Sequence, residues 1–294
     1  MRTDPSPHGD GPQTPISPQW VEPVPPWPTS LVAGLSTRLG GISPPPFDSL
    51  NMGTRTGDDP SRLAANLARL ASATGLPLEQ AARIRLEHGT RALWTDEPGV
   101  WGDADALLTR RPGLPLALTV ADCYPVVMGV PGRVAALLHC GWRSTAGNLV
   151  GVVAETLRRD LEGLPPDGGA LPRDGAASSP NRKALSEALW AWIGPGIGPC
   201  CFEVAPEVAD RFPPEVRRLG DAGDTGNAGD GTPARPHVDL PALLEAQLRE
   251  AGVAPSRLRR DGRCTVCWRR QFFSHRGDGG RTGRMLAWAM LTSG

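Results

Sequence analysis

The sequence predicts an α/β fold in which short strands and amphipathic helices follow one another along the chain. Apolar runs bounded by glycine, proline or aspartate recur from residue 31 to residue 291, as expected for strands. Between them, residues 62–74 and 241–251 carry leucines at helical spacing. Low-complexity stretches lie near residues 163–183 and 220–236. Apolar strands resume directly after the first of these stretches, so we interpret it as an insertion and not as a domain linker.

The composition excludes several classes of protein. The 31 Lys and Arg residues balance the 31 Asp and Glu residues, so no bulk field would draw the chain to nucleic acid or to an anionic membrane. A membrane-spanning segment needs a run of about 18 apolar residues, and we find none. The N-terminus lacks the apolar region of a secretory signal, and the six cysteines are then expected to be reduced thiols in the cytoplasm.

The first part of the chain divides into a leader and the start of a domain. Residues 1–28 are rich in Pro, Gly and Ser, which predicts a disordered leader before a domain of residues 29–294. Residues 31–37 form a predicted strand. The helix at 62–74 follows the cap residues Asp58 and Asp59, and Gly75 ends it.

The predicted strand at 82–88 places a histidine on an apolar face. Ile84, Leu86 and His88 alternate with charged residues, so His88 shares the face of the two apolar side chains. A histidine there is either a satisfied core residue or a ligand.

The stretch 114–150 predicts strand, polar turn, strand, tight turn, strand and helix, and the rest of the chain is organised around it. If Pro131-Gly132 is a two-residue hairpin loop, Cys123 lies opposite Cys140 and diagonal to His139. A sulfur and an imidazole at such a place are either two ligands of one metal or a nucleophile and its base. With His88 they give three ligands and an open fourth position, the pattern of catalytic zinc.

The remaining elements follow in order, and they contain four more cysteines. Cys200-Cys201 follow a Gly-rich run, and we interpret them as small packing residues. Cys264 and Cys267 form a lone C-x-x-C without the second pair of a zinc knuckle. The predicted elements are a helix at 146–160, strands at 106–109 and 189–193, helices at 206–212 and 241–251, and a final strand to 291.

The motifs taken together resemble one family over about residues 31 to 290. This is the YfiH family, once described as multicopper polyphenol oxidases or laccases and now regarded as purine nucleoside phosphorylases. The matching motifs are Ser36-Thr37-Arg38 through Gly41, Ser49-Leu50-Asn51, Gly57-Asp58-Asp59-Pro60, His88-Gly89-Thr90, Ala104-Asp105-Ala106, 119–125, His139 with Gly141-Trp142-Arg143, 193–204, Cys264-Thr265, 272–276 and 282–285.

The resemblance implies a single α/β (α+β) domain of mixed β-sheets flanked by α-helices. It implies that the catalytic residues His88, Cys123 and His139 bind one Zn²⁺. The implied activity is phosphorolysis of adenosine, inosine and S-methyl-5'-thioadenosine, with adenosine deaminase as a second activity. The partners would be purine nucleosides and phosphate. Bacterial members are also described as peptidoglycan editing factors, which implies a hydrolase role on a wrongly loaded UDP-muramoyl precursor.

The sequence departs from the family pattern near the implied substrate. Leu86-Glu87 stands where Gln-Val is usual, Cys140 where Ala is usual, and His275 where Tyr is common. The three metal ligands are intact, so the departures concern the contacts near Leu86 and His275.

Phosphorolysis needs a group that holds an anion beside the ribose. Arg38, at a Gly-rich turn, is the first candidate, followed by Arg143 and Arg276, and each is alternatively a surface salt bridge. Asn51 either binds a ribose hydroxyl or braces a turn. His275 completes the expected substrate contacts.

Two other functions stay open at this point. In the first, Cys123 is the nucleophile and His139 the base of a metal-free hydrolase or deamidase. In the second, the chain binds a partner without catalysis and keeps a structural zinc. A site of two nitrogens and one sulfur also binds Cu²⁺ more tightly than Zn²⁺, so copper-loaded protein is expected to oxidise phenols weakly in vitro, as an adventitious activity.

Overall fold

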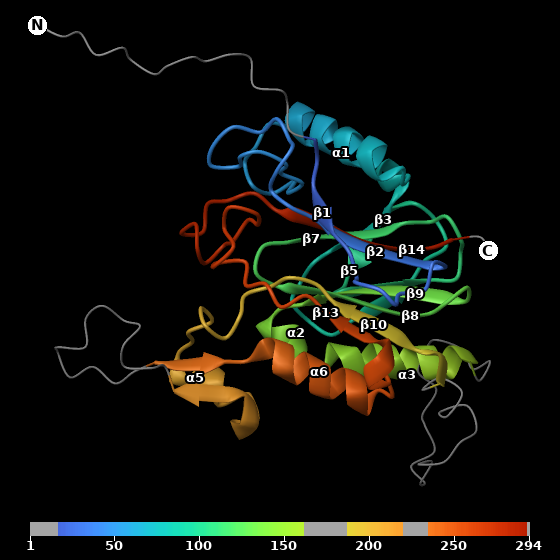
Figure 1. Ribbon diagram of the computed structural model, residues 1–294, viewed down its shortest axis with the longest axis vertical. Helices are drawn as coiled ribbons and strands as arrows, with labels where there is room; N and C mark the ends of the chain where they lie inside the picture. The colour runs from blue at the N-terminus through green and yellow to red at the C-terminus, as the bar shows by residue number, and fades with distance from the viewer. Residues whose placement is uncertain (1–16, 162–186, 220–234, 293–294) are drawn as a thin grey trace, which may run out of the picture.

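The protein has four layers, in which two β-sheets lie face to face between helices (Figure 1). The structure is a computed structural model, and it describes residues 17–161, 187–219 and 235–292. The two predicted insertions, near 163–183 and 220–236, lie almost wholly outside these residues. The described part is a mixed α/β domain, as predicted.

The first sheet has six strands, and the strand latest in the sequence lies near its middle. The antiparallel strands β1, β2, β14 and β7 lie side by side, and β3 and β5 add to β7 in parallel. In sheet order the strands are Trp20–Val21 (β1), Leu31–Ser36 (β2), Met285–Leu291 (β14), Leu116–Val120 (β7), Ala82–Arg85 (β3) and Gly99–Asp103 (β5).

The second sheet is built around the predicted hairpin. Its outer pairs, β13 with β10 and β4 with β6, are parallel, and the inner pairs are antiparallel. The order is Leu258–Arg260 (β13), Trp190–Ile193 (β10), Tyr124–Val130 (β8), Val134–Cys140 (β9), Ala106–Thr109 (β6) and Ala92–Trp94 (β4). A separate pair consists of Arg217–Leu219 (β11) and Pro236–Val238 (β12).

Helices cover the two outer faces, and Figure 1 shows them above and below the sheets. The α-helices are Pro60–Thr74 (α1), Trp142–Ala146 (α2), Leu149–Leu161 (α3), Pro206–Ala209 (α5) and Leu240–Glu250 (α6). Helix α1 begins and ends with the predicted signals: the Asp59 side chain accepts from the backbone N–H of Ser61, and Gly75 has the left-handed φ of 69°. No helix among the described residues is long and apolar enough to cross a membrane.

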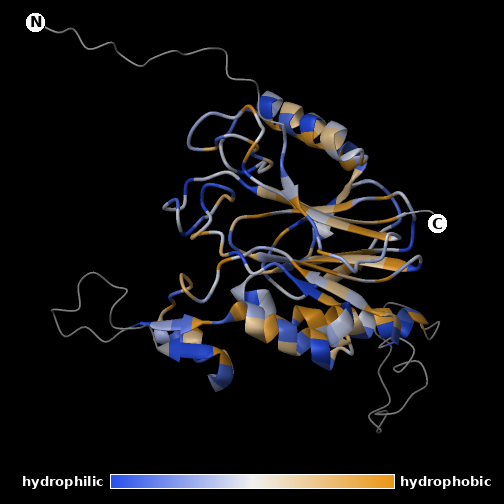
Figure 2. Cartoon of the chain, in the orientation of Figure 1, coloured by the Kyte–Doolittle hydropathy of each residue, from blue (hydrophilic) through white to orange (hydrophobic). Residues whose placement is uncertain are grey.

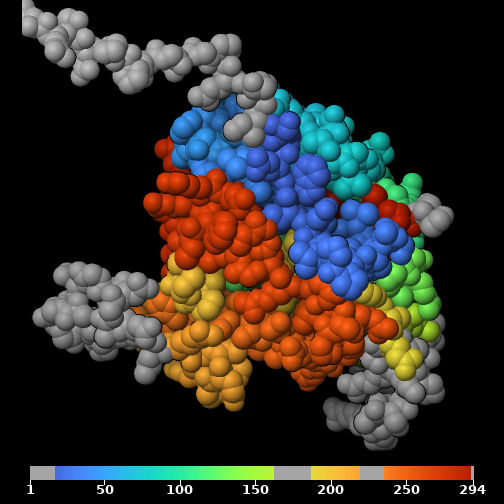
Figure 3. Space-filling view, in the orientation of Figure 1, coloured from blue at the N-terminus to red at the C-terminus, as the bar shows by residue number. Residues whose placement is uncertain are grey.

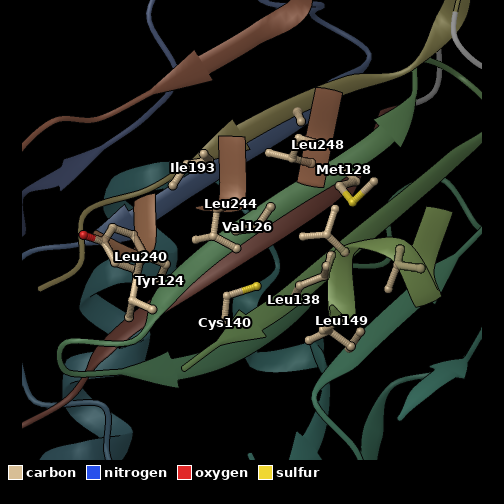
Figure 4. Close-up of a cluster of buried hydrophobic side chains, with 14 of the residues drawn as sticks. Tyr124, Val126, Met128, Leu138, Cys140, Leu149, Ile193, Leu240, Leu244 and Leu248 are labelled. Atoms are coloured by element: carbon tan, nitrogen blue, oxygen red, sulfur yellow. The ribbon is translucent and has the colours of Figure 1, made fainter. Parts of the chain in front are cut away.

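Three apolar cores hold the layers together. One lies between the sheets, one between the first sheet and α1, and one between the second sheet and helices α3 and α6. In Figure 4, Leu240, Leu244 and Leu248 of α6 point at Tyr124, Val126 and Met128 of β8, beside Leu138 of β9. Both faces of β8 and β9 are therefore buried, which explains why their sequences are continuous apolar runs without alternation (Figure 2).

The second part of the predicted leader, residues 17–28, is described by the structure and packs on the domain. Trp20 and Val21 form β1, which pairs with Ser36 and Leu35 of β2. The Trp27 ring packs edge-on against Trp190, with ring centroids 5.8 Å apart. Residues 17–28 thus belong to the domain, because Val21 and Trp27 pack on the core between the sheets, while Trp20 is exposed. Residues 1–16 lie outside the described part.

The hairpin and the helix after it differ from the prediction. Val130 pairs with Val134 and Tyr124 with Cys140, so Arg133 is a third loop residue and the register moves by one. The cause is the turn type: Gly132 has φ 71° after Pro131, and Arg133 N–H donates to the Val130 carbonyl, as in a type II turn. The predicted helix at 146–160 corresponds to α3, which begins at Leu149 because Asn148, with φ 58°, separates it from the short helix α2 that was not predicted.

Candidate metal centre

Three segments converge at one end of the sheets and bring His88, Cys123 and His139 together. His88 follows β3, Cys123 lies in the turn between β7 and β8, and His139 is near the end of β9. Their ligand atoms all lie within 4.8 Å of one another. The two imidazole rings are 4.8 Å apart between centroids, at 76°. The three predicted ligands therefore form one cluster.

His88 reaches the cluster in a way that the alternation pattern does not predict. Strand β3 ends at Arg85, and His88 has a φ of 62° and an exposed side chain. It does not lie on the buried face of a strand. The left-handed backbone after β3 turns the imidazole toward Cys123 and His139, so the open side of the cluster faces solvent at His88.

Asp105 organises both histidines from behind, and the sequence reasoning did not single it out. Its carboxylate is fully buried and lies 2.8 Å from Nδ1 of His139. It also accepts the backbone N–H groups of His88 at 3.0 Å and Gly89 at 2.6 Å. A carboxylate on Nδ1 leaves the other ring nitrogen of His139 for the cluster, which is how metal-binding histidines are commonly oriented. The motif Ala104-Asp105-Ala106 was the available signal.

Asp122 fixes the turn that carries Cys123. Its backbone has φ 88°, and its buried carboxylate accepts the hydroxyls of Thr265 at 2.6 Å and Ser274 at 2.7 Å. It also accepts the backbone N–H of Arg276 at 2.7 Å. The C-terminal loop thus holds the sulfur ligand in place, and Figure 3 shows this red-orange segment on the surface between the blue N-terminal loops and the yellow segment near residue 200. Only the place of Asp122 in the motif 119–125 could have pointed to this role.

Gly141, between β9 and α2, allows the close approach of the three segments. A Cβ atom at this position would lie 3.0 Å from Sγ of Cys123 and 3.2 Å from Cδ2 of His88. The first distance is shorter than a relaxed carbon–sulfur contact. A side chain where α2 begins would therefore require Cys123 or His88 to shift by a few tenths of an ångström.

The cluster also sets the protonation of its own members. Burial disfavours the Cys123 thiolate, but the charge of His139 and hydrogen bonds from His139 and His88 outweigh it and lower the pKa of Cys123 to about 6. Burial disfavours the charge on His139 as well, yet the Cys123 charge and the Asp105 hydrogen bond raise the pKa of His139 to about 9. Without a metal, the pair is therefore a thiolate beside an imidazolium at neutral pH.

The donor set fits one zinc ion. Two imidazole nitrogens and a sulfur that is readily deprotonated are the ligand types zinc prefers, and three protein ligands leave a fourth position open. The Asp105 carboxylate supplies the usual outer partner of a metal-bound histidine. His88, Cys123 and His139 are the residues that would hold the ion.

The predicted anion clamp, Arg38, lies in a different environment from the metal ligands. With Asp48, Asp278, Arg269 and Arg270 it lines a hollow of about 450 Å³. Its guanidinium donates to the carbonyl oxygens of Asp48 at 2.8 Å and Arg269 at 2.9 Å, and stacks on Phe273 at 4.7 Å. None of the three metal ligands lines this hollow, but Phe273 precedes Ser274, which contacts Asp122.

Asn51 is not placed to bind a ribose hydroxyl. Its side chain is fully buried. The amide nitrogen donates to Thr56 and Asp58, and the amide oxygen accepts the backbone N–H groups of Gly53 and Arg284. All of its hydrogen-bonding capacity is used by its own loop and by Arg284, so the structure favours the alternative, a brace for the turn.

The other predicted substrate residues are exposed near the cluster. Arg143 lies on α2 and stacks on the ring of Trp142 at 4.2 Å. Arg276 donates to the carbonyl oxygen of Glu203 at 2.9 Å. His275 is exposed beside it. The structure thus brings these three side chains to the same end of the molecule as Cys123 without placing them in contact with it.

The chain is similar to known proteins over almost its whole length. Residues 32–167 and 176–292 match the family model described as multi-copper polyphenol oxidoreductase laccase. A purine nucleoside phosphorylase of Deinococcus radiodurans is 35% identical over 257 residues, 87% of each chain. The purine nucleoside phosphorylase YfiH of Escherichia coli is 34% identical, over 94% of this chain and 98% of that protein. The crystal structure of YlmD from Geobacillus stearothermophilus superposes with a TM-score of 0.74 at 33% identity, covering 92% and 94% of the two chains.

Proposed function

The chain belongs to the laccase-like YfiH family, and from this premise we propose that it is a zinc-dependent purine nucleoside phosphorylase. Its proposed substrates are adenosine, inosine and S-methyl-5'-thioadenosine with inorganic phosphate, and adenosine deamination is the proposed second activity. One observation carries the proposal: the His88, Cys123 and His139 ligand atoms converge within 4.8 Å, with a buried carboxylate orienting His139.

The residues of the cluster would divide the work as follows. A zinc ion held there supplies Lewis acidity beside the open position. Asp105 holds His139 in one tautomer and ties down the backbone of His88. Gly141 keeps the approach to Cys123 clear of side-chain atoms. The exposed side of the cluster, at His88, is where a nucleoside would enter.

The anion clamp is proposed at Arg38. Three arginines and two aspartates line its hollow, which leaves an excess of positive charge for phosphate. The Arg38 side chain is only 14% exposed and is held by two carbonyl oxygens and by ion pairs with Asp48 at 3.2 Å and Asp278 at 3.9 Å. It is therefore preorganised and loses little freedom on binding, and an incoming phosphate would compete with these two carboxylates. Arg143 on α2 is the competing candidate, because it lies on the helix that follows His139.

Product analysis tests the reaction and a pair of variants tests the clamp. The zinc form should convert inosine to hypoxanthine and ribose 1-phosphate only when phosphate is present. Arg38→Gln should raise the KM for phosphate about tenfold or more, since hydrogen bonds to charged groups contribute about 1.5–3 kcal/mol, and Arg143→Gln should leave it unchanged. If base forms at the same rate without phosphate, the enzyme is a hydrolase. If instead Arg143→Gln raised the KM for phosphate and Arg38→Gln did not, Arg143 on α2 would be the phosphate-binding residue.

A second candidate, the metal-free hydrolase, is favoured by Asp105. A cysteine hydrolase needs a third group to orient its histidine, and the sequence reasoning found no carboxylate for this role. The structure supplies one, because Asp105, His139 and Cys123 lie in the order of a catalytic triad. An argument against this candidate is that such a triad assigns no catalytic role to His88, which lies in the same cluster. Full activity in chelated protein would favour the hydrolase; loss of activity that zinc restores would exclude it.

The metal is proposed to be zinc and not copper. Copper would bind this donor set, and any phenol oxidation would then be adventitious. Protein purified without added copper should oxidise no phenols. Oxidase activity that scales with native copper content would overturn this assignment.

A further inference from the structure

Four cysteines converge at a second place, on the exposed loops beside the C-terminal segment. Cys200 and Cys201 come from the Gly-rich loop after β10, and Cys264 and Cys267 follow β13. The Sγ atom of Cys267 lies 3.6 Å from that of Cys200 and 3.5 Å from that of Cys201. All four sulfurs lie within 4.8 Å of one another. We call this group the four-cysteine cluster.

Packing alone does not account for the four-cysteine cluster. Cys200 and Cys267 are exposed and Cys201 is half-buried, so burial does not explain why they face one another. Cys201 does pack against the apolar core beneath the second sheet, as predicted, but packing explains neither the exposed Cys200 nor the sulfur contacts with Cys267. The vicinal pair is the second pair that the C-x-x-C sequence lacked.

The geometry points to a metal. Four sulfurs bound to one zinc at about 2.3 Å form a tetrahedron with edges of about 3.8 Å, close to the two distances around Cys267. The backbone N–H of Gly198 donates to Sγ of Cys264 at 3.2 Å, as expected where a sulfur carries negative charge. A Cβ on Gly198 would lie 3.1 Å from Cβ of Cys264 and 3.3 Å from Sγ of Cys200, so the loop packs directly on the cluster.

We propose that Cys200, Cys201, Cys264 and Cys267 bind one structural zinc ion. Four protein ligands close the coordination sphere, so this ion would have no open position and no catalytic part. Two thiolate pairs give the site a net charge of about −2. The Arg276 guanidinium beside it, which donates to the carbonyl of Cys201 at 3.5 Å, offsets part of that charge.

A disulfide accounts for the arrangement less well. Cys267 is almost equally distant from Cys200 and Cys201. A disulfide would use one of these two and leave the other thiol beside it without a role. One ion at the centre uses all four sulfurs.

The proposed zinc would brace the turn that carries Cys123. One segment of the cluster donates the Ile197 N–H to the carbonyl oxygen of Asp122, at 2.8 Å. The other segment supplies Thr265, and farther along Ser274, to the Asp122 carboxylate. An ion that joins the two segments would therefore fix both sets of hydrogen bonds that hold Asp122, one to its carbonyl oxygen and one to its carboxylate.

Zinc content and coordination test the proposal on the full chain. Wild-type protein, expressed in zinc-supplemented medium, should hold about two zinc ions per chain, and Cys267→Ser and Cys123→Ser about one each. X-ray absorption at the zinc edge of Cys123→Ser protein should show sulfur neighbours and no imidazole nitrogen. Cys200→Ser serves as a second variant beside Cys267→Ser. Cys200 and Cys267 are both exposed, and each substitution replaces one sulfur atom by oxygen.

The outcomes separate this proposal from the proposed function. If Cys267→Ser and Cys200→Ser hold as much zinc as wild type, the four cysteines bind no metal. A disulfide in the isolated protein, seen as a mass 2 Da below that of the reduced chain, would also overturn the proposal. Zinc bound through sulfur alone in Cys123→Ser protein would support it, whether or not the enzyme is a phosphorylase.

Discussion

The metal centre and the four-cysteine cluster both contain cysteine sulfur, but the sulfur lies in different surroundings. At the centre, the two imidazoles and the sulfur come from the loop after β3, the turn between β7 and β8, and the end of β9, and a buried carboxylate orients His139. At the cluster, four sulfurs lie on loops, and a backbone N–H contacts one of them. Three ligands leave a position for a substrate and four do not. The difference teaches that the ligand count and the supporting residues, more than the sulfur itself, separate a reactive site from a brace.

The largest effect is expected when an imidazole ligand of the metal centre is removed. His139→Ala should lose the metal of the centre and lower kcat/KM by a factor on the order of 10³, since a Lewis acid contributes several kcal/mol to the transition state. Zinc analysis and turnover of inosine measure the two effects. His237→Ala is the control, because that ring contacts only the Pro199 carbonyl among the contacts described. A variant that keeps its metal but not its turnover would make His139 a base.

The thiols should differ in their reactivity once metal is removed. The pKa of Cys123 is lowered to about 6, so its thiolate is present above pH 6 and is lost below it. Burial, together with hydrogen bonds that its S–H donates to Cys267 and Cys264, raises the pKa of Cys200 to about 12, so it is a thiol at neutral pH. At pH 7.5, after allowing for the weaker nucleophilicity of a low-pKa thiolate, chelated protein should be alkylated at Cys123 roughly 50-fold faster.

Peptide mapping with a small alkylating reagent measures both rates. The Cys123 rate should rise with pH to a plateau above about pH 7. Equal rates at Cys123 and Cys200 would show that the histidines do not activate the sulfur of the centre.

The carboxylate behind His139 should matter less than the ligand itself. Asp105→Asn should weaken zinc binding at the centre on the order of tenfold, because the amide no longer fixes the imidazole by charge. Asp103→Asn is a matched control two residues away, since Asp103 forms a half-exposed ion pair with Arg85. Competition with a chromophoric chelator gives the affinities. Equal affinities in the two variants would reduce Asp105 to a structural residue.

The smallest effect is expected at Gly141, which lies beside the metal centre. Gly141→Ala places a methyl group 3.0 Å from Sγ of Cys123 and should cost about 1 kcal/mol, or about fivefold in zinc affinity. Gly262→Ala is the control, because a Cβ there meets nothing within 4 Å. The same chelator competition measures both. An unchanged affinity in Gly141→Ala would mean that the segments shift to accept the methyl group.

The strands could be predicted from the sequence better than the turns that connect them. Continuous apolar runs marked β8 and β9, and the residue types of His88, Cys123 and His139 marked the centre. The left-handed φ of His88 and the third loop residue of the hairpin were missed, because alternation patterns describe strands and not the turns between them.

The supporting residues were harder to predict than the ligands. Asp103 and Asp105 flank the same alanine, yet one is exposed beside Arg85 and the other is buried behind His139. Nothing local distinguishes them, because the burial of Asp105 depends on contacts with His139, 34 residues away. The four-cysteine cluster was missed for the same reason, since it joins residues 66 and 67 positions apart.

The position of β14 has a consequence for synthesis of the chain. This strand follows every other strand in sequence but lies between β2 and β7, near the middle of the first sheet. While the ribosome is still making the preceding residues, β2 and β7 each present an unpaired edge, which is a template for association with other chains. All three metal ligands have emerged by then, but Ser274 and Arg276, which hold Asp122, follow them much later in the sequence. A nascent chain is therefore expected to depend on chaperones until residues 285–291 join the sheet, and its metal centre to become rigid only at that stage.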